Sequence, residues 1–294
     1  MNHLSDIRIK DAAPHIFRRP FLFVESNTQM LQIATFFAIG PQIYVDGIIV
    51  IDEVQKRPVG RISSKHIISS ILDSGYPGCL QKKASQIMDN SVVPLEMDSP
   101  IKEALEVFER TRFAFIPILT KKEDKMDDLD DSFKVVTASL AIRDILPLIA
   151  EANLNIPIGE LSSQLISLDA RTSIRIALDY MLNNGIRNIG IKSNLSHIIN
   201  DRKILEFLLS HNGRTVLLKN GIAGLADLNI VDNLDIISAT SVKSNTTVSR
   251  AAELLMDIHN PCLILEDNEK VEHNYVLTPW DIVMKTLLGG KSNN

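Results

Sequence analysis

Tyr275-Val276-Leu277-Thr278-Pro279-Trp280-Asp281-Ile282-Val283 is typical of an apolar strand that runs directly into a helix. Junctions of the same kind occur three more times, at Gly60–Ile67, Val136–Ile145 and Ile198–Ile204. Aligned on Ser63, Ala141, Asn200 and Thr278, the four junctions lie 78, 59 and 78 residues apart, so alternate junctions are separated by 137 residues in both cases. A regular spacing of this kind indicates internal repeats. We infer four divergent repeats that descend from a duplicated pair.

The segments between the junctions predict an amphipathic helix and short strands. Apolar residues recur at the i, i+3, i+4, i+7 spacing in Ile101-Ala104-Leu105-Phe108, Ile174-Ala177-Leu178-Met181 and Val248-Ala251-Ala252-Leu255. The apolar runs at 114–119 and 261–265 are too uniform for half-exposed strands, which indicates strands covered by helices. Each repeat therefore has the order β-α-β-β-α, and the predicted fold class is α+β.

Polar residues in front of these helices predict where the helices begin. Ser99, Thr172 and Thr246 each stand just before an amphipathic segment, and we expect them to act as N-caps. Asn184-Gly185 predicts the end of one helix, because glycine adopts the left-handed conformation that closes a helix.

The repeats are expected to form two pairs. One repeat buries little apolar surface, so two must pack together to make a stable domain. The predicted boundary lies near Glu151–Asn155, where an extended segment follows a helix. We expect a first pair over residues 1–150, with repeats at about 9–76 and 83–150, and a second pair over 151–294, with repeats at about 156–211 and 221–288. These pairs would stack, within the chain or between two chains, as a flat disc.

The composition argues against several classes of protein. The 31 basic and 36 acidic residues give a net charge of -5, which provides no general attraction for polyanions, so nucleic acid is not expected as a partner. No apolar run reaches the roughly 18 residues that a membrane helix needs, so we expect a cytoplasmic protein without membrane contact. Cys79 and Cys262 have no metal-type spacing around them and are expected to be reduced thiols.

Catalytic motifs are missing from the sequence. It contains no Gly-rich phosphate loop, no paired metal-ligand helix and no Ser or Cys in a nucleophile setting, and its seven His residues occur singly. We therefore expect that the protein is not an enzyme and has no metal site of its own.

The repeats resemble the CBS domain, named for the regulatory domain of cystathionine beta-synthase, whose tandem pairs are called Bateman modules. The resemblance is carried by the junctions and by the entry segments Ile9–Pro14, Ala84–Asp89 and Ile158–Ser163, and it covers nearly the whole chain. The start of the fourth repeat, Gly221–Ile236, is looser. The resemblance implies a stand-alone regulatory protein that binds an adenine nucleotide or related adenosyl ligand between paired repeats.

The resemblance also implies that a Ser or Thr at the junction, and an Asp three residues later, hold ribose hydroxyls. Only Thr278 with Asp281 is complete in this respect. An ionised Asp can accept hydrogen bonds from two neighbouring hydroxyls, each contributing about 1.5–3 kcal/mol. The same residues also suit a helix N-terminus, with Thr278 as cap and Asp281 in the field of the helix dipole. The sequence leaves both roles open.

Three further residues are candidate nucleotide contacts. Asp144 stands at the Asp position of the second repeat, although Ala141 replaces the hydroxyl residue there. Arg187 and His259 precede the second strand of the third and fourth repeats, where the resemblance implies a basic residue on phosphate. In each case the alternative is a helix-start carboxylate or an exposed cation.

The first and third junctions depart further from the pattern. Lys203 and His66 take the Asp position there, and either could meet a phosphate or simply lie on the surface of its helix. Arg112 in the second repeat lies about two positions from the place of Arg187. The expected ligand is AMP, ADP or ATP, with or without Mg²⁺, and S-adenosylmethionine is the alternative.

Two other functions stay open. Three incomplete junctions would suit a structural or protein-interaction module that does not bind ligand. A nucleic-acid-associated regulator would need a basic face formed by Arg18, Arg19, Lys82 and Lys83. The sensing function requires a protein partner that the sequence does not identify, and a homodimer is compatible with it.

Overall fold

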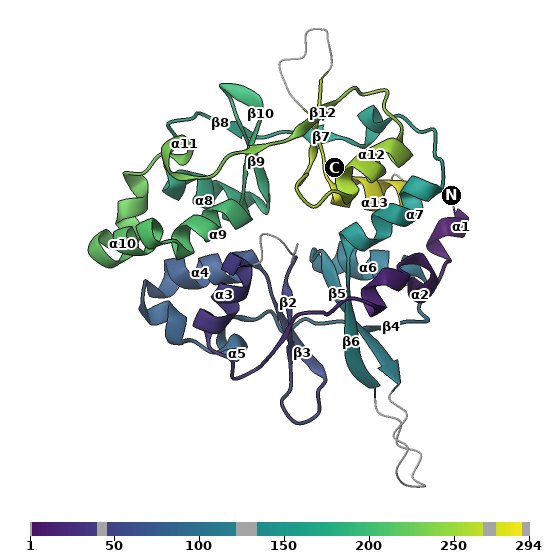
Figure 1. Ribbon diagram of the computed structural model, residues 1–294, viewed down its shortest axis with the longest axis horizontal. Helices are drawn as coiled ribbons and strands as arrows, with labels where there is room; N and C mark the ends of the chain where they lie inside the picture. Colours follow the sequence, from purple (N-terminus) through teal and green to yellow (C-terminus); the bar gives the residue numbers. More distant parts are fainter. Residues whose placement is uncertain (1, 40–45, 122–133, 267–274, 290–294) are drawn as a thin grey trace.

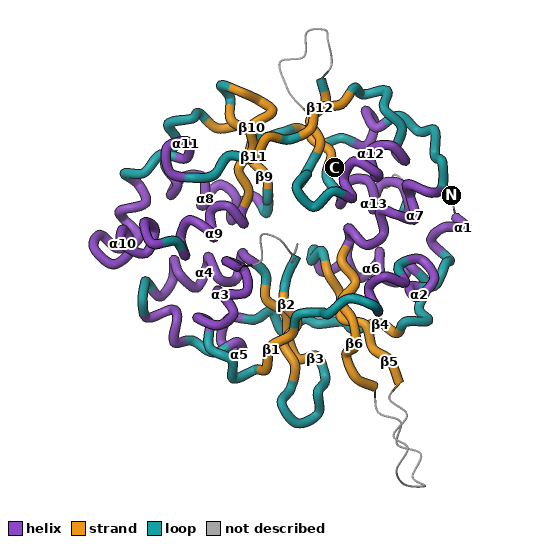
Figure 2. The backbone as a smooth tube through the Cα atoms, viewed as in Figure 1, coloured by secondary structure: helices purple, strands orange, loops and turns teal. Residues whose placement is uncertain are grey.

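The computed structural model describes residues 2–39, 46–121, 134–266 and 275–289. Four small sheets and the helices beside them form four α+β units around a common centre (Figure 1). Strands run through the middle of the molecule and helices gather at its two sides (Figure 2). The predicted α+β class and the order β-α-β-β-α are confirmed. Among the described residues, no helix is both long enough and apolar enough to span a bilayer.

The first two repeats have the predicted elements in order. Repeat 1 contains β1 (Phe23–Glu25), α3 (Met30–Ile39), β2 (Ile48–Ile51), β3 (Pro58–Ile62) and α4 (Ser64–Ser74). Repeat 2 contains β4 (Leu95–Glu96), α6 (Ile101–Thr111), β5 (Phe115–Lys121) and β6 (Lys134–Ala141), followed by the 3₁₀ turn η4 (Ile142–Ile145) and α7 (Leu146–Glu151). In both sheets the first strand is parallel to the second, and the second is antiparallel to the third.

The last two repeats follow the same plan. Repeat 3 contains β8 (Ser167–Leu168), α8 (Ile174–Asn184), β9 (Asn188–Ile191), β10 (Asn194–Asn200) and α9 (Asp201–Leu209). Repeat 4 contains β12 (Thr240–Val242), α12 (Val248–Met256), β13 (Leu263–Leu265), β14 (Tyr275–Leu277) and α13 (Pro279–Leu287). All three predicted amphipathic helices are present, and Gly185 ends α8 in the left-handed conformation, with φ 64°.

Each repeat sends a short entry helix to the neighbouring repeat. These helices are α2 (Ile9–Ala12), α5 (Ala84–Ile87), η5 (Ile158–Leu161) and α11 (Ile230–Asn233). Isolated bridges tie the residue before each of them to the start of the other repeat's first helix: Arg8 to Pro100, Lys83 to Gln29, Pro157 to Thr247 and Asn229 to Ser173. Repeats 1 and 2 therefore exchange entry helices, and so do repeats 3 and 4.

This exchange explains why the predicted N-caps are wrong by one residue. The N-caps are Ser173 and Thr247, one residue after the predicted Thr172 and Thr246. The hydroxyl of each N-cap accepts a backbone N–H of the first helical turn, at a distance of 3.3 Å. The carbonyls of Thr172 and Thr246 instead accept from the entry helices, at 2.9 and 3.0 Å.

Ser99 shows the same displacement in repeat 2. Its carbonyl accepts the Ile9 N–H at 2.9 Å, and the residue at the N-cap of α6 is Pro100. The polar residues in front of these helices therefore hold the neighbouring repeat through their backbone.

Sheets of sequence-neighbouring repeats also meet through short strands and small apolar clusters. β7 (Ser163–Gln164) from the start of repeat 3 adds to β14, and β11 (Ile237–Ser238) from the start of repeat 4 adds to β10. The cluster between sheets of repeats 3 and 4 is Leu165, Ile198, Ala239, Cys262, Ile264 and Val276. Its counterpart between repeats 1 and 2 is Ile49, Ile51 and Phe115.

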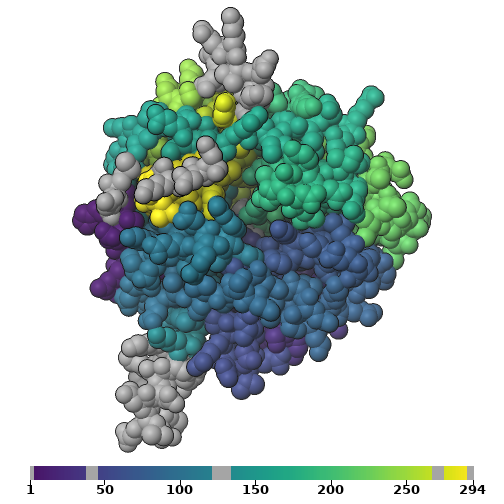
Figure 3. Space-filling view, turned by 180° about the vertical axis from the view of Figure 1, so that it is seen from behind, coloured from purple at the N-terminus to yellow at the C-terminus, as the bar shows by residue number. Residues whose placement is uncertain are grey.

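The two large cores follow a different division of the chain. One gathers helix and strand residues of repeats 2 and 4, and includes Phe108, Ile149, Leu255 and Ile282. The other gathers those of repeats 1 and 3, and includes Phe37, Ile67, Leu178 and Leu205. Repeat 1 accordingly lies against repeat 3 when the molecule is seen from behind, blue beside teal and green (Figure 3). Each large core thus contains residues of two repeats that lie about 137 positions apart in the chain.

A few elements lie outside the repeat plan. They are α1 (Asn2–Ser5), the 3₁₀ helices η1 (Pro14–Phe17), η3 (Gly78–Gln81) and η6 (Gly221–Ala226), and α10 (His211–Asn220). Both cysteines are buried free thiols, and burial raises the pKa of Cys262 to about 12.

Candidate functional site

A central cavity of about 780 Å³ is lined by residues of all four repeats. Repeat 1 contributes Ser63 and His66, repeat 2 Phe113 and Arg143, repeat 3 Arg187 and Asp201, and repeat 4 Thr278 and Asp281. Residues at the starts of α4, η4, α9 and α13 are among those that line this cavity. The volume is in the range of about 300–1,000 Å³ that small-molecule sites have.

Asp281 lies at this cavity, but its carboxylate already has four protein donors. Oδ2 accepts from the Thr278 backbone N–H at 3.0 Å and from its hydroxyl at 2.6 Å. Oδ1 accepts from the Ser163 hydroxyl at 2.9 Å and lies 3.0 Å from Lys285 Nζ. Since a carboxylate has about four acceptor positions, a ribose hydroxyl can bind Asp281 only by replacing one of these donors. The capping role that the sequence left open is present: Thr278 Oγ1 accepts the Asp281 N–H at 3.2 Å.

The carboxylate of Asp144 also has four protein donors, and Asp144 is not among the residues that line the cavity. Arg19 donates to both of its oxygens, at 2.8 and 2.6 Å, and His15 Nε2 lies 3.1 Å from Oδ1. The Ala141 N–H donates to Oδ2 at 2.7 Å, and Asp144 is only 6% exposed. Arg19, which the nucleic-acid alternative placed on a basic face, is thus committed to a carboxylate.

Arg187 lines the cavity and pairs with two carboxylates. Its Nε lies 3.3 Å from both oxygens of Asp201, at the start of α9, and its NH1 lies 3.2 Å from Asp46 Oδ1. Asp201 also accepts from the hydroxyl of Ser64, the first residue of α4. Arg187 therefore belongs to a network that crosses from repeat 3 to repeat 1.

In repeat 1, His66 replaces the expected Asp and caps the helix by a different chemistry. Its Nδ1 accepts the Ser63 N–H at 3.0 Å, which assigns the proton of the neutral ring to Nε2. The imidazole stacks on Phe113, and the Arg61 guanidinium lies 3.5 Å from the centroid of the same ring. Burial lowers the pKa of His66 below its usual value.

Lys203 and His259 lie away from the cavity-lining residues. Lys203 Nζ donates to Glu206 at 2.8 Å and lies 3.7 Å from Asp235, so it serves an ion-pair cluster on α9. His259 is exposed, and its backbone N–H donates to Asp257. Only Thr278, Asp281 and Arg187 of the six predicted residues meet at one cavity.

Three cations at the same cavity, Lys65, Arg112 and the buried Arg143, were missed or given only a marginal place in the sequence analysis. Lys65 and Arg112 are both exposed and line the cavity on the side of repeats 1 and 2. Arg112 closes α6 in the left-handed conformation, with φ 58°. Lys65 stands two residues after Ser63 and belongs to no motif, so nothing in the sequence distinguished it from other lysines at helix starts.

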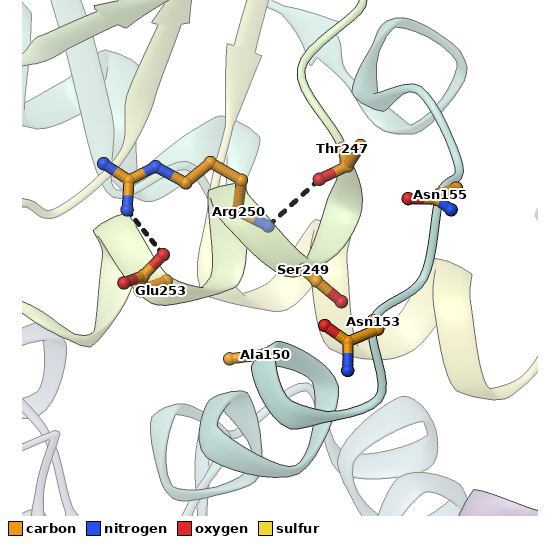
Figure 4. Close-up of a pocket in the computed structure, with 7 residues that line it drawn as sticks. All are labelled: Ala150, Asn153, Asn155, Thr247, Ser249, Arg250 and Glu253. Carbon is orange, nitrogen blue, oxygen red and sulfur yellow. Dashed lines mark hydrogen bonds and ion pairs between the residues drawn. The ribbon is translucent and has the colours of Figure 1, made fainter.

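A second, smaller pocket of about 230 Å³ lies between α7 and α12 (Figure 4). Several of its polar groups already have protein partners: Ser249 donates to the Ile149 carbonyl at 2.7 Å and accepts the Leu154 N–H at 2.8 Å, while Arg250 pairs with Glu253. This pocket is a seam where the two halves of the chain join.

No group of three or more His, Cys, Asp or Glu side chains that could hold a metal ion occurs within the part of the chain that the structure describes.

Comparisons with known proteins show what the chain is similar to. Residues 84–127 match the model of the CBS domain. The structure is similar to that of a protein from Methanocaldococcus jannaschii described as a proposed archaeal homologue of g-AMPK, with 15% identity, a TM-score of 0.76, and coverage of 95% of this chain and 100% of that one. It is also similar to a conserved protein from Pyrococcus horikoshii, with 14% identity, a TM-score of 0.50, and coverage of 84% and 93%. No curated protein matches the sequence.

These similarities cover different parts of the chain. At 14–15% identity the two solved structures establish a shared fold over nearly the full length, and the family model matches part of repeat 2. The predicted resemblance to the CBS domain is confirmed for residues 84–127, and four repeats of one fold surround one cavity.

Proposed function

We propose that the protein is a non-catalytic regulator that binds an adenine nucleotide in its central cavity. The observation that carries this proposal is the meeting of Thr278, Asp281 and Arg187 with the cations Lys65 and Arg112 around one cavity of ligand size. Hydroxyl and carboxylate groups suit a ribose, and guanidinium and ammonium groups suit phosphates. S-adenosylmethionine, which lacks phosphate, is the alternative ligand.

Binding at Asp281 requires an exchange of donors. The ribose hydroxyls would replace the Ser163 hydroxyl or the Lys285 ammonium on Oδ1, while Thr278 keeps its bonds to Oδ2. Lys285 loses little, because it also donates to the Leu161 carbonyl at 2.7 Å. Donor exchange of this kind costs less than opening a packed interface, since each group keeps a partner.

The regulatory step would be a shift in population between arrangements of the repeats. A ligand that contacts several repeats favours the arrangement it binds best, and it can shift the equilibrium only by its difference in affinity for the two states. A protein partner that distinguishes these states would receive the signal.

A structural module without ligand is the competing function. It is favoured by the four donors on each of Asp281 and Asp144, which leave neither carboxylate short of partners. The nucleic-acid alternative is weaker, because Arg19 of its basic face is paired with Asp144.

The two carboxylates also provide a matched experiment. Asp281→Ala and Asp144→Ala each remove a saturated carboxylate at a helix start, and we expect both to lower the stability of the unliganded protein by about 1–3 kcal/mol. Thermal unfolding and calorimetry with AMP, ADP, ATP and S-adenosylmethionine then separate the roles. A ligand at 100 times its Kd stabilises by about 2.7 kcal/mol, which is roughly 5–10 °C.

We expect one ligand to raise Tm in the wild type and in Asp144→Ala, and to lose most of this effect in Asp281→Ala. Equal shifts in all three proteins would reject Asp281 as a contact. No shift with any of the four ligands would reject the sensor and favour the structural module.

A further inference from the structure

Arg187 connects the cavity with the contact between repeats 1 and 3. It lies just before β9 of repeat 3, and its guanidinium reaches Asp46, which lies just before β2 of repeat 1. The Asp46 side chain is 4% exposed, whereas that of Arg187 is 43% exposed. The carboxylate of this ion pair is thus buried in the protein, whereas the guanidinium is accessible to a ligand in the cavity.

A second link crosses the same boundary. The Ser64 hydroxyl of repeat 1 donates to Asp201 of repeat 3, and Asp201 also binds Arg187 Nε. Arg187 therefore holds two carboxylates, one on each side of the contact. Helices α4 and α9, whose first residues are Ser64 and Asp201, pack in the core shared by repeats 1 and 3.

The geometry of the Arg187 pairs with Asp46 and Asp201 leaves both pairs open to competition. Arg187 approaches Asp201 through Nε at 3.3 Å and Asp46 through NH1 at 3.2 Å, both longer than the 2.7–2.9 Å of strong charge-assisted hydrogen bonds. A phosphoryl oxyanion offers the same guanidinium shorter, bidentate contacts.

We infer that Arg187 is an exchangeable latch: a phosphoryl group in the cavity competes with Asp46 for the Arg187 guanidinium, and its binding loosens the contact between repeats 1 and 3. The inference rests on the proposed function only in placing a phosphoryl group in the cavity. By linkage, any change that weakens the Asp46–Arg187 pair strengthens oxyanion binding, and oxyanion binding weakens the pair by the same factor.

The test uses inorganic pyrophosphate as the probe and Asp46→Asn as the variant. Asn keeps the size and the acceptor oxygen of Asp but removes the competing charge. We expect pyrophosphate to bind Asp46→Asn about three- to tenfold more tightly than the wild type by calorimetry, which corresponds to the loss of one partly exposed ion pair. A residue with a purely structural role would give unchanged or weaker binding.

The control is Asp89→Asn. Asp89 also lines the cavity, and its carboxylate lies 3.7 Å from Arg61, so this variant changes the charge of the cavity equally but leaves Arg187 untouched. An equal gain of affinity in Asp89→Asn would overturn the latch, because the effect would then be one of overall charge. Arg187→Gln in the Asp46→Asn background should abolish the gain.

A measurement on the wild type does not depend on how well the variants fold. Pyrophosphate should increase hydrogen exchange of the amides at the start of α4 and α9, and increased protection or no change there would overturn the latch. Absence of pyrophosphate binding in both wild type and Asp46→Asn would also overturn it. Failure of adenine nucleotides alone, with the pyrophosphate results as expected, would remove the proposed function and leave the latch in place.

Discussion

Arg143 is a buried cation whose removal should clearly lower the stability of the protein. It lies in the 3₁₀ turn η4, just before α7 of repeat 2, and is 9% exposed. Its guanidinium donates to the carbonyls of Leu255, Asp257 and Asn260, at and beyond the end of α12 in repeat 4. A cation at a helix C-terminus binds carbonyls that lack intrahelical partners and opposes the negative end of the helix dipole.

The magnitude follows from these contacts. A hydrogen bond from a charged donor contributes about 1.5–3 kcal/mol, and water entering the space left by Arg143→Ala will recover part of three such bonds. We expect a net loss of about 3 kcal/mol in the free energy of unfolding. Urea denaturation measures it, followed by circular dichroism and by the fluorescence of Trp280, which contacts Phe108 edge-on across repeats 2 and 4.

The control is Arg250→Ala on α12, the helix whose C-terminal carbonyls Arg143 binds. Its side chain is 56% exposed and pairs with Glu253 three residues along, so its loss should cost about 0.5 kcal/mol or less. If Arg143→Ala falls within 1 kcal/mol of Arg250→Ala, the carbonyl contacts contribute far less than their geometry implies, and the account of the contact between repeats 2 and 4 is wrong.

Two other substitutions test local features. Burial lowers the pKa of His66, so the folded state favours the neutral imidazole. The contribution of this neutral imidazole to the free energy of unfolding is complete above the unfolded pKa of 6.5. It is lost as the pH falls from 6.5 through the lower pKa of the folded state. His66→Gln should therefore unfold in urea with a smaller difference between pH 7.5 and pH 5 than the wild type, and an unchanged difference would exclude His66 as the cause. Gly213→Ala should destabilise the protein by about 2 kcal/mol or more, since the added Cβ would lie 2.0 Å from the Phe207 carbonyl oxygen, whereas Gly78→Ala, which meets nothing within 4 Å, should be neutral. Equal midpoints for the two alanine variants would contradict the packing of α10 on α9.

Local pattern was sufficient for the elements of each repeat. The apolar faces of α6, α8 and α12 and the four junctions depend on residues within one turn or one strand, and these were predicted correctly. The entry helix of repeat 4 was not resolved from sequence, although Asn229 caps it through the Asp232 N–H at 2.8 Å. This helix has only four residues, which is too short for a periodic pattern of apolar residues to appear in the sequence.

The candidate site was predictable only in part, because its partners come from distant positions. The carboxylate at a junction can be found by its spacing, but the residues that fill it cannot: Arg19 reaches Asp144 over 125 positions, and Ser163 reaches Asp281 over 118. Lys203 has the junction spacing as well, yet its side chain turns to Glu206 on its own helix. A spacing rule therefore locates the helix start and leaves the direction of the side chain undetermined.

The repeats associate in two ways, and both bear on the regulatory role that we propose for the cavity. Entry helices and small sheet clusters join repeats that are neighbours in sequence, while the large cores join repeats 1 with 3 and 2 with 4. A rotation within one sequence pair must therefore be accommodated in both large cores. Since packed cores switch between discrete arrangements more readily than they deform, a ligand that changes one junction at the cavity should change the relation of all four repeats together.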